Sequence, residues 1–160
     1  MYFARFAPLS LAFFVTCADQ ISKFFVLRSA LPEEPQILAP FLRLVYAENT
    51  GAAFSFLAGR GEWAQWLLRG FSAAACAIIL IWLWRRPPRG EGIALALVLG
   101  GAAGNLIDRL RFGYVVDFID AHWGAYHWPA FNIADSAITI GALLLMRQLF
   151  FADKNERENK

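Results

Sequence analysis

Stretches of apolar residues, each about as long as a membrane-spanning helix, recur along this chain between shorter polar stretches. A helix needs about 20 mostly apolar residues to cross the hydrocarbon core of a bilayer. Four windows meet that length, at residues 6–27, 65–84, 92–112 and 133–151. The pattern therefore predicts an all-α membrane protein with four transmembrane helices, in a single domain over residues 1–160.

Two of the connections between these windows are rich in β-branched and aromatic residues. Residues 40–56 predict a strand over 41–46, a turn at Asn49-Thr50-Gly51 and a second extended run over 52–56. Residues 113–131 carry the same residue types, but apolar and polar positions alternate only in fragments. We expect a small β element with an apolar face on the membrane surface, and a disordered tail over residues 153–160.

Composition agrees with the membrane class. The 160 residues are 58% hydrophobic and 18% charged, whereas soluble domains carry about 25% charged residues. A net charge of +2 without a long basic cluster argues against binding to nucleic acid. Cys17 and Cys76 both lie in apolar windows, so we interpret them as packing residues and expect no disulfide.

The basic loop over residues 85–91 predicts the orientation of the helices. Short loops rich in arginine or lysine stay in the cytoplasm. Both chain termini then lie in the cytoplasm, while residues 40–56 and 113–131 lie outside. The first window could also be a cleaved signal peptide. Because apolar sequence continues beyond Lys23 and no small-residue cleavage site follows, we predict a retained helix.

With this orientation, polar residues of the apolar windows gather at the extracytoplasmic ends of the helices. Polar groups at membrane depth face protein or a wet cavity, so we expect one shared polar site near the outer surface. The residues concerned are Asp19, Lys23, Arg69, Asn105, Asp108, Arg109 and Asp135.

Helical spacing predicts structural roles for part of this set. Asp19 and Lys23 are four residues apart, a spacing at which an acid and a base can pair. Gly100 and Gly104 form a stripe that is typical of close helix packing in lipid. Arg109 has two open interpretations, since its side chain could reach the membrane interface or bind the backbone of a substrate.

Asp117 and Asp135 are the strongest candidates for chemistry. Asp135 comes three residues after Asn132, so helix capping alone could explain it. Asp117 has no such explanation, and its apolar neighbours disfavour the ionised carboxyl and raise its pKa. One carboxylate held neutral beside one favoured as an anion could activate water, as in aspartic proteases. Asp120, three residues after Asp117, is equally suited to face solvent.

Other kinds of chemistry find less support. His122, His127 and Asp120 match no compact metal-ligand spacing. No base stands at a recognisable spacing from Ser136 or Cys17, and the glycine patterns that bind nucleotide phosphates do not occur. We therefore expect neither a metal nor an organic cofactor.

Five short motifs occur in one order along the chain. They are Asp19-Gln-Ile-Ser-Lys23, Asn49-Thr-Gly-Ala-Ala-Phe54, Gly104-Asn-Leu-Ile-Asp-Arg109, Val116-Asp-Phe118 and Phe131-Asn-Ile-Ala-Asp-Ser136. Together they resemble the motif set of the bacterial lipoprotein signal peptidases, the signal peptidase II family. The resemblance extends from the first apolar window to the start of the fourth.

The resemblance implies an aspartic endopeptidase of the bacterial inner membrane, with four transmembrane helices and an extracytoplasmic β-sheet cradle that includes residues 40–56 and 113–131. Its substrates would be lipid-modified prolipoproteins, cut before the diacylglyceryl-cysteine, with membrane phospholipid nearby and no obligate protein partner. Asp117 and Asp135 would be the catalytic dyad. The substrate site would include Asn49, Gly51, Asn105, Arg109 and Asn132, supported by Asp19, Lys23 and Asp108.

The residues alone leave a second class of function open. A small proton-coupled carrier or channel subunit could use the same carboxylates as a proton relay. Such a protein should carry acidic residues throughout the membrane depth, whereas the window at 65–84 contains none.

Overall fold

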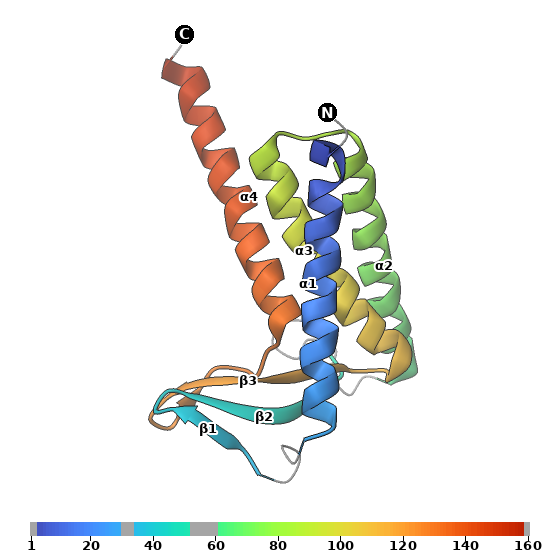
Figure 1. Ribbon diagram of the computed structural model, residues 1–160, viewed down its shortest axis with the longest axis vertical. Helices are drawn as coiled ribbons and strands as arrows, with labels where there is room; N and C mark the ends of the chain where they lie inside the picture. Colours follow the sequence, from blue (N-terminus) through green and yellow to red (C-terminus); the bar gives the residue numbers. More distant parts are fainter. Residues whose placement is uncertain (1–2, 30–33, 52–60, 159–160) are drawn as a thin grey trace.

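The computed structural model describes residues 3–29, 34–51 and 61–158. Four helices stand side by side, a sheet of short strands lies at one end of them, and both chain termini lie at the other end (Figure 1). In chain order the elements are α1 (Phe3–Leu27), β1 (Gln36–Ala39), β2 (Leu42–Asn49), α2 (Glu62–Trp84), α3 (Arg89–Arg111), β3 (Val115–Trp123), β4 (Tyr126–His127) and α4 (Ile133–Glu158).

α3 is the central helix of the bundle and packs against α1, α2 and α4. The predicted glycine stripe explains how closely α1 approaches it. A Cβ on Gly100 would lie 2.6 Å from the carbonyl oxygen of Ala12, and a Cβ on Gly104 would lie 2.5 Å from Asp19 Oδ2. The packing role predicted for the two glycines is therefore confirmed, because no side chain would fit at either position without displacing α1.

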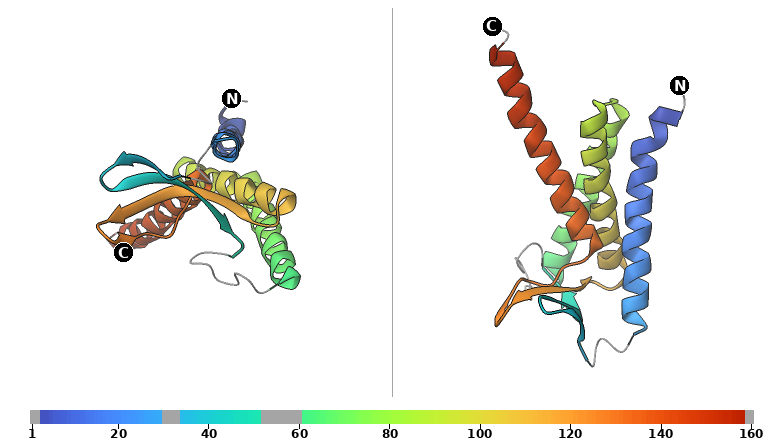
Figure 2. Two further views of the ribbon diagram at one scale, coloured as in Figure 1. Left: turned by 90° about the horizontal axis from the view of Figure 1, so that it is seen from below. Right: turned by 60° about the vertical axis from the view of Figure 1, so that its left-hand side comes forward.

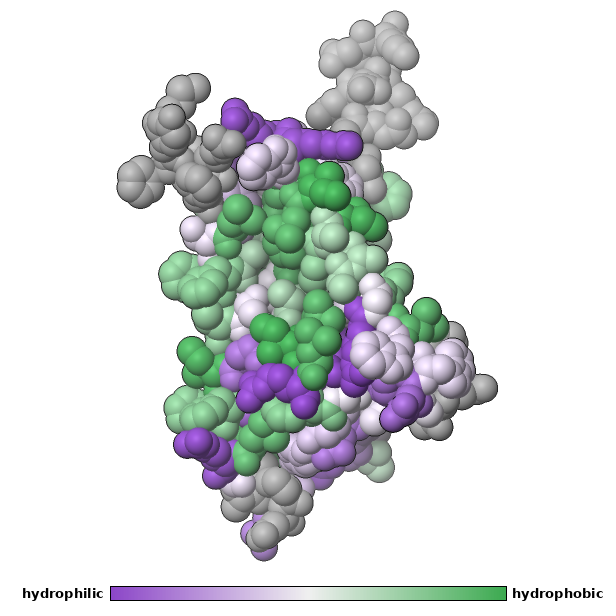
Figure 3. Space-filling view, turned by 90° about the vertical axis from the view of Figure 1, so that its right-hand side faces the viewer, coloured by the Kyte–Doolittle hydropathy of each residue, from purple (hydrophilic) through white to green (hydrophobic). Residues whose placement is uncertain are grey.

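Among the described residues, three helices are long and apolar enough to cross a membrane, over Ala7–Leu27, Glu62–Trp84 and Arg89–Arg111. α2 is the most exposed of them, with 11% of its apolar window buried. Figure 3 shows a hydrophobic band across the helical part of one face, with hydrophilic groups above and below it. These features agree with a membrane protein, and the fourth span at residues 133–151 stays a prediction.

The described strands form one antiparallel sheet in the order β1-β2-β3-β4. The strand predicted over residues 41–46 is present as β2, but β1 and β3 are its neighbours. The second extended run, expected at 52–56, lies outside the described residues. β2 and β3 pair so that Ala47 lies opposite Asp117. The sheet crosses the end of the helices, as the view from below shows (Figure 2).

β3 is the main element that the alternation of apolar and polar residues did not predict. The fragmentary alternation at residues 113–131 by itself indicates a loop, whereas the resemblance places this segment in the β-sheet cradle, and residues 115–123 do form a nine-residue strand. Its first four residues are all buried, so side chains on both faces of this part of the strand are covered. A strand covered on both faces has no reason to alternate apolar and polar residues, and its period of two is lost.

Helix ends differ from the apolar windows in a consistent way. α1, α2 and α3 each begin three residues before the window predicted for them, and each added segment contains a charged residue, which a hydropathy window leaves out although a helix can include it. α4 continues to Glu158, so the prediction of a disordered tail is wrong for residues 153–158. That segment contains neither glycine nor proline, so nothing in it ends the helix. Residues 159 and 160 lie outside the described part.

Candidate active site

Asp117 and Asp135 come from different layers of the fold and meet where the sheet covers the bundle. Asp117 is the third residue of β3, and Asp135 lies in the first turn of α4. Asp117 is 2% exposed, whereas Asp135 is half-buried. The sheet thus places a buried carboxylate beside the N-terminus of the helix that carries the second one.

Asn132 joins the two carboxylates directly. Its side-chain Nδ2 donates to Asp117 Oδ1 over 2.7 Å, and its backbone N–H donates to Asp135 Oδ2 over 3.2 Å. In return, the backbone N–H of Asp135 donates to Asn132 Oδ1 over 2.9 Å. This reciprocal pair is the helix cap that the spacing of the two residues predicts. The cap and the dyad therefore share one asparagine.

Asn105 of α3 provides a second link between the carboxylates. Its Nδ2 donates to Asp135 Oδ1 over 2.8 Å, while its Oδ1 accepts from Asn132 Nδ2 over 3.1 Å. Lys23 Nζ also donates to Asn105 Oδ1, over 3.0 Å. Asn105 thus links the buried ammonium of Lys23 to the carboxylate of Asp135.

Lys23 lies between two buried carboxylates and contacts Asp135 indirectly, through Asn105. Its Nζ lies 2.8 Å from Asp19 Oδ2 and 2.8 Å from Asp108 Oδ2, and all three residues are at most 2% exposed. The pairing predicted from the spacing of Asp19 and Lys23 is confirmed. The two carboxylates also hold the backbone, since Asp108 accepts from the N–H of Val116 and Asp19 from the N–H of Ala134. These contacts fix the backbone next to each dyad aspartate.

The last residue of β2, Asn49, and Gly51 of the turn that follows it lie at the same site. Asn49 Nδ2 donates to Asp117 Oδ2 over 3.0 Å, and the backbone N–H of Gly51 donates to Asn49 Oδ1 over 3.0 Å. Arg109 Nη2 donates to the carbonyl of Gly51 over 3.1 Å. Arg109 is 9% exposed, which overturns the interpretation that its side chain reaches the membrane interface. Arg69 Nε in turn donates to the carbonyl of Arg109 over 2.9 Å.

The environment of Asp117 sets its acidity. Burial, followed by the negative charge of Asp135, raises the pKa of Asp117 to about 7, against hydrogen bonds from Asn49 and Asn132 that lower it. The raised pKa predicted from the apolar neighbours of Asp117 is thereby confirmed. Asp135 lies at a helix N-terminus, where the helix dipole favours a negative charge. The two carboxylates therefore experience different environments although they share Asn132.

Asp120 lies on the same strand as Asp117 but belongs to a separate cluster. Arg43 Nε donates to its Oδ2 over 2.5 Å, and His127 Nδ1 lies 2.9 Å from its Oδ1. Burial alone would raise the pKa of Asp120, but the hydrogen bonds from His127 and Arg43 outweigh burial and lower the pKa. The rings of His122 and His127 lie 4.9 Å apart and are tilted by 33°, yet no group of three metal-ligating side chains occurs in the described part of the chain.

A family model described as Signal peptidase (SPase) II matches residues 11–151 of this sequence. The chain belongs to the signal peptidase II family. A lipoprotein signal peptidase of Shewanella sediminis is 48% identical over 145 residues, 89% of this chain and 82% of the relative. Another, of Ralstonia nicotianae, is 50% identical over 131 residues, 80% of this chain and 75% of the relative. The protein is therefore an aspartic endopeptidase, as the motifs indicate.

Two solved structures have the same fold. A bacterial membrane enzyme solved by the in meso method at 2.3 Å resolution superposes with a TM-score of 0.84 at 30% identity, over 93% of this chain and 90% of that one. A second such structure, at 1.9 Å, gives 0.78 at 30% identity over 89% and 92%. The mostly helical architecture with a small sheet is thus the architecture of a membrane enzyme.

Two glutamines of the candidate site in this signal peptidase II chain escaped sequence reasoning. Gln20 Nε2 donates to Asp108 Oδ1 over 2.9 Å and to the carbonyl of Gly104 over 3.1 Å. Gln65 Nε2 donates to the carbonyl of Thr50 over 2.5 Å. Neither residue is charged, so neither stood out within an apolar window. A signal was present, because amide side chains in such windows often form hydrogen bonds between helices.

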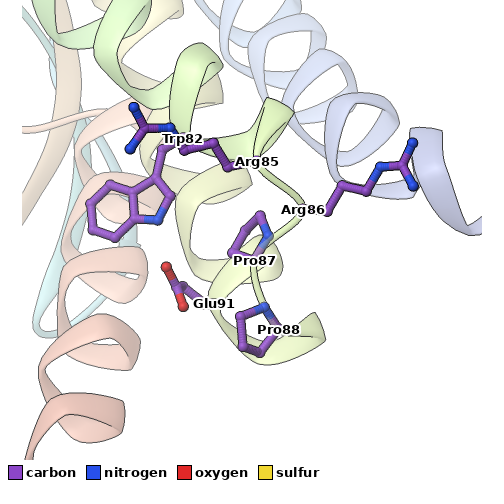
Figure 4. Close-up of a pocket in the computed structure, with 6 residues that line it drawn as sticks. All are labelled: Trp82, Arg85, Arg86, Pro87, Pro88 and Glu91. Atoms are coloured by element: carbon purple, nitrogen blue, oxygen red, sulfur yellow. The ribbon is translucent and has the colours of Figure 1, made fainter.

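One surface hollow of this signal peptidase II chain lies at the opposite end of the bundle from the dyad. It surrounds the basic loop between α2 and α3, and the side chains of Arg86 and Glu91 lie on different sides of that loop (Figure 4). The lining residues are Trp82, Arg85, Arg86, Pro87, Pro88 and Glu91. Since no dyad residue contributes to it, the polar network rather than surface shape identifies the candidate active site.

Proposed function

We propose that this protein removes the signal peptide from lipid-modified prolipoproteins by cutting the peptide bond before the diacylglyceryl-cysteine. The observation that carries the proposal is the contact of one asparagine, Asn132, with both Asp117 and Asp135. Two carboxylates held at one site and in different environments are the arrangement with which aspartic proteases activate water. The names of the relatives supply the class of substrate.

In the first half of the reaction, Asp135 acts as the base and Asp117 as the acid. Asp135 removes a proton from a water molecule, whose oxygen attacks the carbonyl carbon of the scissile bond. Asp117, with its raised pKa, gives its proton to the carbonyl oxygen. The product of this step is a tetrahedral diol, with Asp135 protonated and Asp117 ionised.

In the second half the two carboxyl groups exchange roles. Asp117 takes a proton from one hydroxyl of the diol, the C–N bond breaks, and Asp135 gives its proton to the leaving amine. The new carboxyl terminus belongs to the signal peptide, and the new amino terminus belongs to the lipid-modified cysteine. Both carboxyl groups return to their starting states, so the reaction consumes one water and needs no cofactor.

The proposed placement in the membrane follows from the spans and from charge. With the basic loop over residues 85–91 in the cytoplasm, the sheet and the dyad lie at the extracytoplasmic face of the inner membrane, and four helices span the bilayer. The diacylglyceryl group would stay in the lipid beside the bundle and hold the cleavage site at the depth of the dyad. Positioning of this kind contributes a large share of the rate of many enzymes.

The dyad is tested by cleavage of a purified lipidated precursor in detergent or lipid. Asp117→Asn and Asp135→Asn should each abolish detectable turnover. Asp120→Asn is the matched control, because Asp120 lies on the same strand but contacts Arg43 and His127 instead of the dyad. Asp120→Asn should keep near-native turnover. Substantial turnover by a folded Asp117→Asn or Asp135→Asn protein would overturn the mechanism.

The role of the lipid needs a separate comparison. The same precursor, prepared without its diacylglyceryl group, should be cleaved much more slowly by the native enzyme. Equal rates for the two precursors would contradict lipid positioning while leaving the dyad intact. A proton relay, by contrast, would conduct protons in vesicles and would cleave neither precursor.

A further inference from the structure

The turn that follows β2 is held from two helices through its backbone carbonyls. Gln65 of α2 donates its Nε2 to the carbonyl of Thr50, and Arg109 of α3 donates its Nη2 to the carbonyl of Gly51. Arg109 belongs to the predicted substrate site, whereas nothing so far assigns a role to Gln65. The two contacts fix successive peptide units of the same turn.

This turn determines where Asn49 points. The backbone N–H of Gly51 donates to Asn49 Oδ1 over 3.0 Å. A backbone N–H can only donate, so it obliges the oxygen of the Asn49 amide to face the turn. The amide nitrogen is then directed to Asp117 Oδ2, 3.0 Å away. Any movement of the turn would therefore move a hydrogen bond to the dyad.

The contact of Gln65 with the turn carries a penalty in the free energy of folding. Oε1 of the same side chain is buried and has no hydrogen-bond partner among the described residues. A buried acceptor without a partner is unfavourable, and an apolar side chain of similar length would avoid it. The bond from Nε2 to Thr50 is thus the interaction that the amide contributes at this position. It also links α2, whose main packing partner is α3, to the sheet.

We propose that Gln65 is a positioning residue of the enzyme: by holding the carbonyl of Thr50, it keeps the Asn49 amide directed at Asp117. The inference rests on the proposed function of Asp117. Gln65 acts through Asn49 and does not itself touch the reacting atoms.

The first test replaces the amide by an apolar chain of similar length. Gln65→Met should lower kcat/KM for the lipidated precursor by about 3- to 10-fold, the effect of losing one hydrogen bond. Gln148→Met is the matched control, because Gln148 lies beside Gly90 in the first turn of α3, and α3 begins at the end of the bundle away from the sheet (Figure 1). It should leave kcat/KM unchanged.

A double-mutant cycle separates positioning from a merely structural contribution. If Gln65 acts through Asn49, then Gln65→Met should have little further effect once Asn49→Ala has removed the amide. Both single variants should also move the alkaline limb of the pH profile upwards, because the hydrogen bond from Asn49 lowers the pKa of Asp117. Fully additive losses, or an unshifted limb, would overturn the proposal.

Gln65→Glu provides a second variant of nearly the same shape. An ionised glutamate at this position would have no proton to donate to the carbonyl of Thr50, whereas a protonated one would regain a donor. The activity of this variant relative to the native enzyme should therefore recover as the pH falls towards about 5, near the usual range of a glutamic acid. A constant ratio across pH would contradict the role of the donor.

The outcomes distinguish this inference from the proposed function. If Asp117→Asn is inactive while Gln65→Met and Gln65→Glu behave like the native enzyme, the positioning role fails and the dyad stands. If Asp117→Asn stays active, the proposed function itself fails.

Discussion

Lys23 Nζ donates to Asn105 Oδ1 over 3.0 Å, and this contact decides which way the Asn105 amide faces. An ammonium group has no acceptor, so the amide oxygen must turn to Lys23 and the amide nitrogen to Asp135. Asn132 is oriented by the same rule, because the backbone N–H of Asp135 donates to its oxygen. Each amide is thus oriented by a group that can only donate, and each presents N–H to a carboxylate.

Removal of the ammonium should destabilise the fold. Lys23→Met would leave Asp19 and Asp108 buried without their positive partner, which costs about 3–5 kcal/mol in comparable buried pairs. We expect a clear drop in the midpoint of thermal unfolding in detergent. Adding Asp19→Asn to Lys23→Met should recover part of the loss, because one buried negative charge disappears. A midpoint equal to that of the native protein would show that the buried charges do not support the fold.

Removal of the shared amide should affect catalysis more than stability. Asn132→Ser keeps a side-chain oxygen that can cap α4, but its hydroxyl is too short to reach Asp117. Turnover should fall by about 100-fold, as it does when an oriented donor is removed from other active sites. Thermal unfolding should change little, which serves as the control. Near-native turnover would show that the bond from Asn132 to Asp117 is dispensable.

The raised pKa of Asp117 predicts the alkaline limb of the pH profile. Asp117 must carry a proton to act as the acid, and its pKa lies at about 7. We therefore expect kcat/KM, which reports the free enzyme, to fall as the pH rises through about 7. A value of kcat/KM that stays constant well above that pH would contradict the assignment of Asp117 as the acid.

The titration of Asp117 should also make the stability of the fold depend on pH, in a direction that follows from proton linkage. The unfolded chain releases the proton of an aspartic acid near pH 3.9, whereas the folded chain keeps that of Asp117 up to about pH 7. The folded state thus binds more protons between these values, and stability falls as the pH rises through that window. Asp117→Asn should flatten this slope, as measured by unfolding at several pH values. An unchanged slope would contradict the titration of Asp117 in this range.

Gly104 should be intolerant of even one methyl group. A Cβ at this position would lie 2.5 Å from Asp19 Oδ2, so Gly104→Ala would separate α1 from α3 and cost about 1–3 kcal/mol. Gly70→Ala is the matched control, since a Cβ there would have no neighbour within 4 Å. It should be neutral or slightly stabilising, because alanine favours a helix over glycine. Equal unfolding midpoints for the two variants would refute the packing role of Gly104.

The helices could be predicted because hydropathy along a membrane protein is a strong signal. Windows of about 20 apolar residues located α1, α2 and α3 to within a turn, and the spacing of Asp19 and Lys23 predicted their ion pair. β3 could not be predicted in the same way, because burial on both of its faces removes the alternation that identifies a strand. The helical continuation of α4 to Glu158 was not predicted for a related reason, because a hydropathy window does not detect a helix of polar residues.

Some properties of the candidate site could likewise be predicted from the sequence, and others could not. Apolar neighbours along the chain were enough to predict that Asp117 has a raised pKa, because apolar residues on both sides of a carboxyl indicate its burial. Which donors meet Asp117 depends on residues far from it in the chain, including Asn49 and Asn132. The partner of Gln65 could not be predicted, because its contact with Thr50 depends on how α2 lies beside the end of β2.

By itself, the sequence determined the class of the protein, its apolar helices, its family and the two aspartates, because composition, spacing and motifs are local properties of the chain. Only the tertiary structure decided how those aspartates are held. Hydrogen bonds from Lys23 of α1 and from the backbone N–H of Asp135 set the orientation of the Asn105 and Asn132 amides, and burial, followed by the charge of Asp135, raises the pKa of Asp117. Both effects depend on groups brought together from distant parts of the sequence.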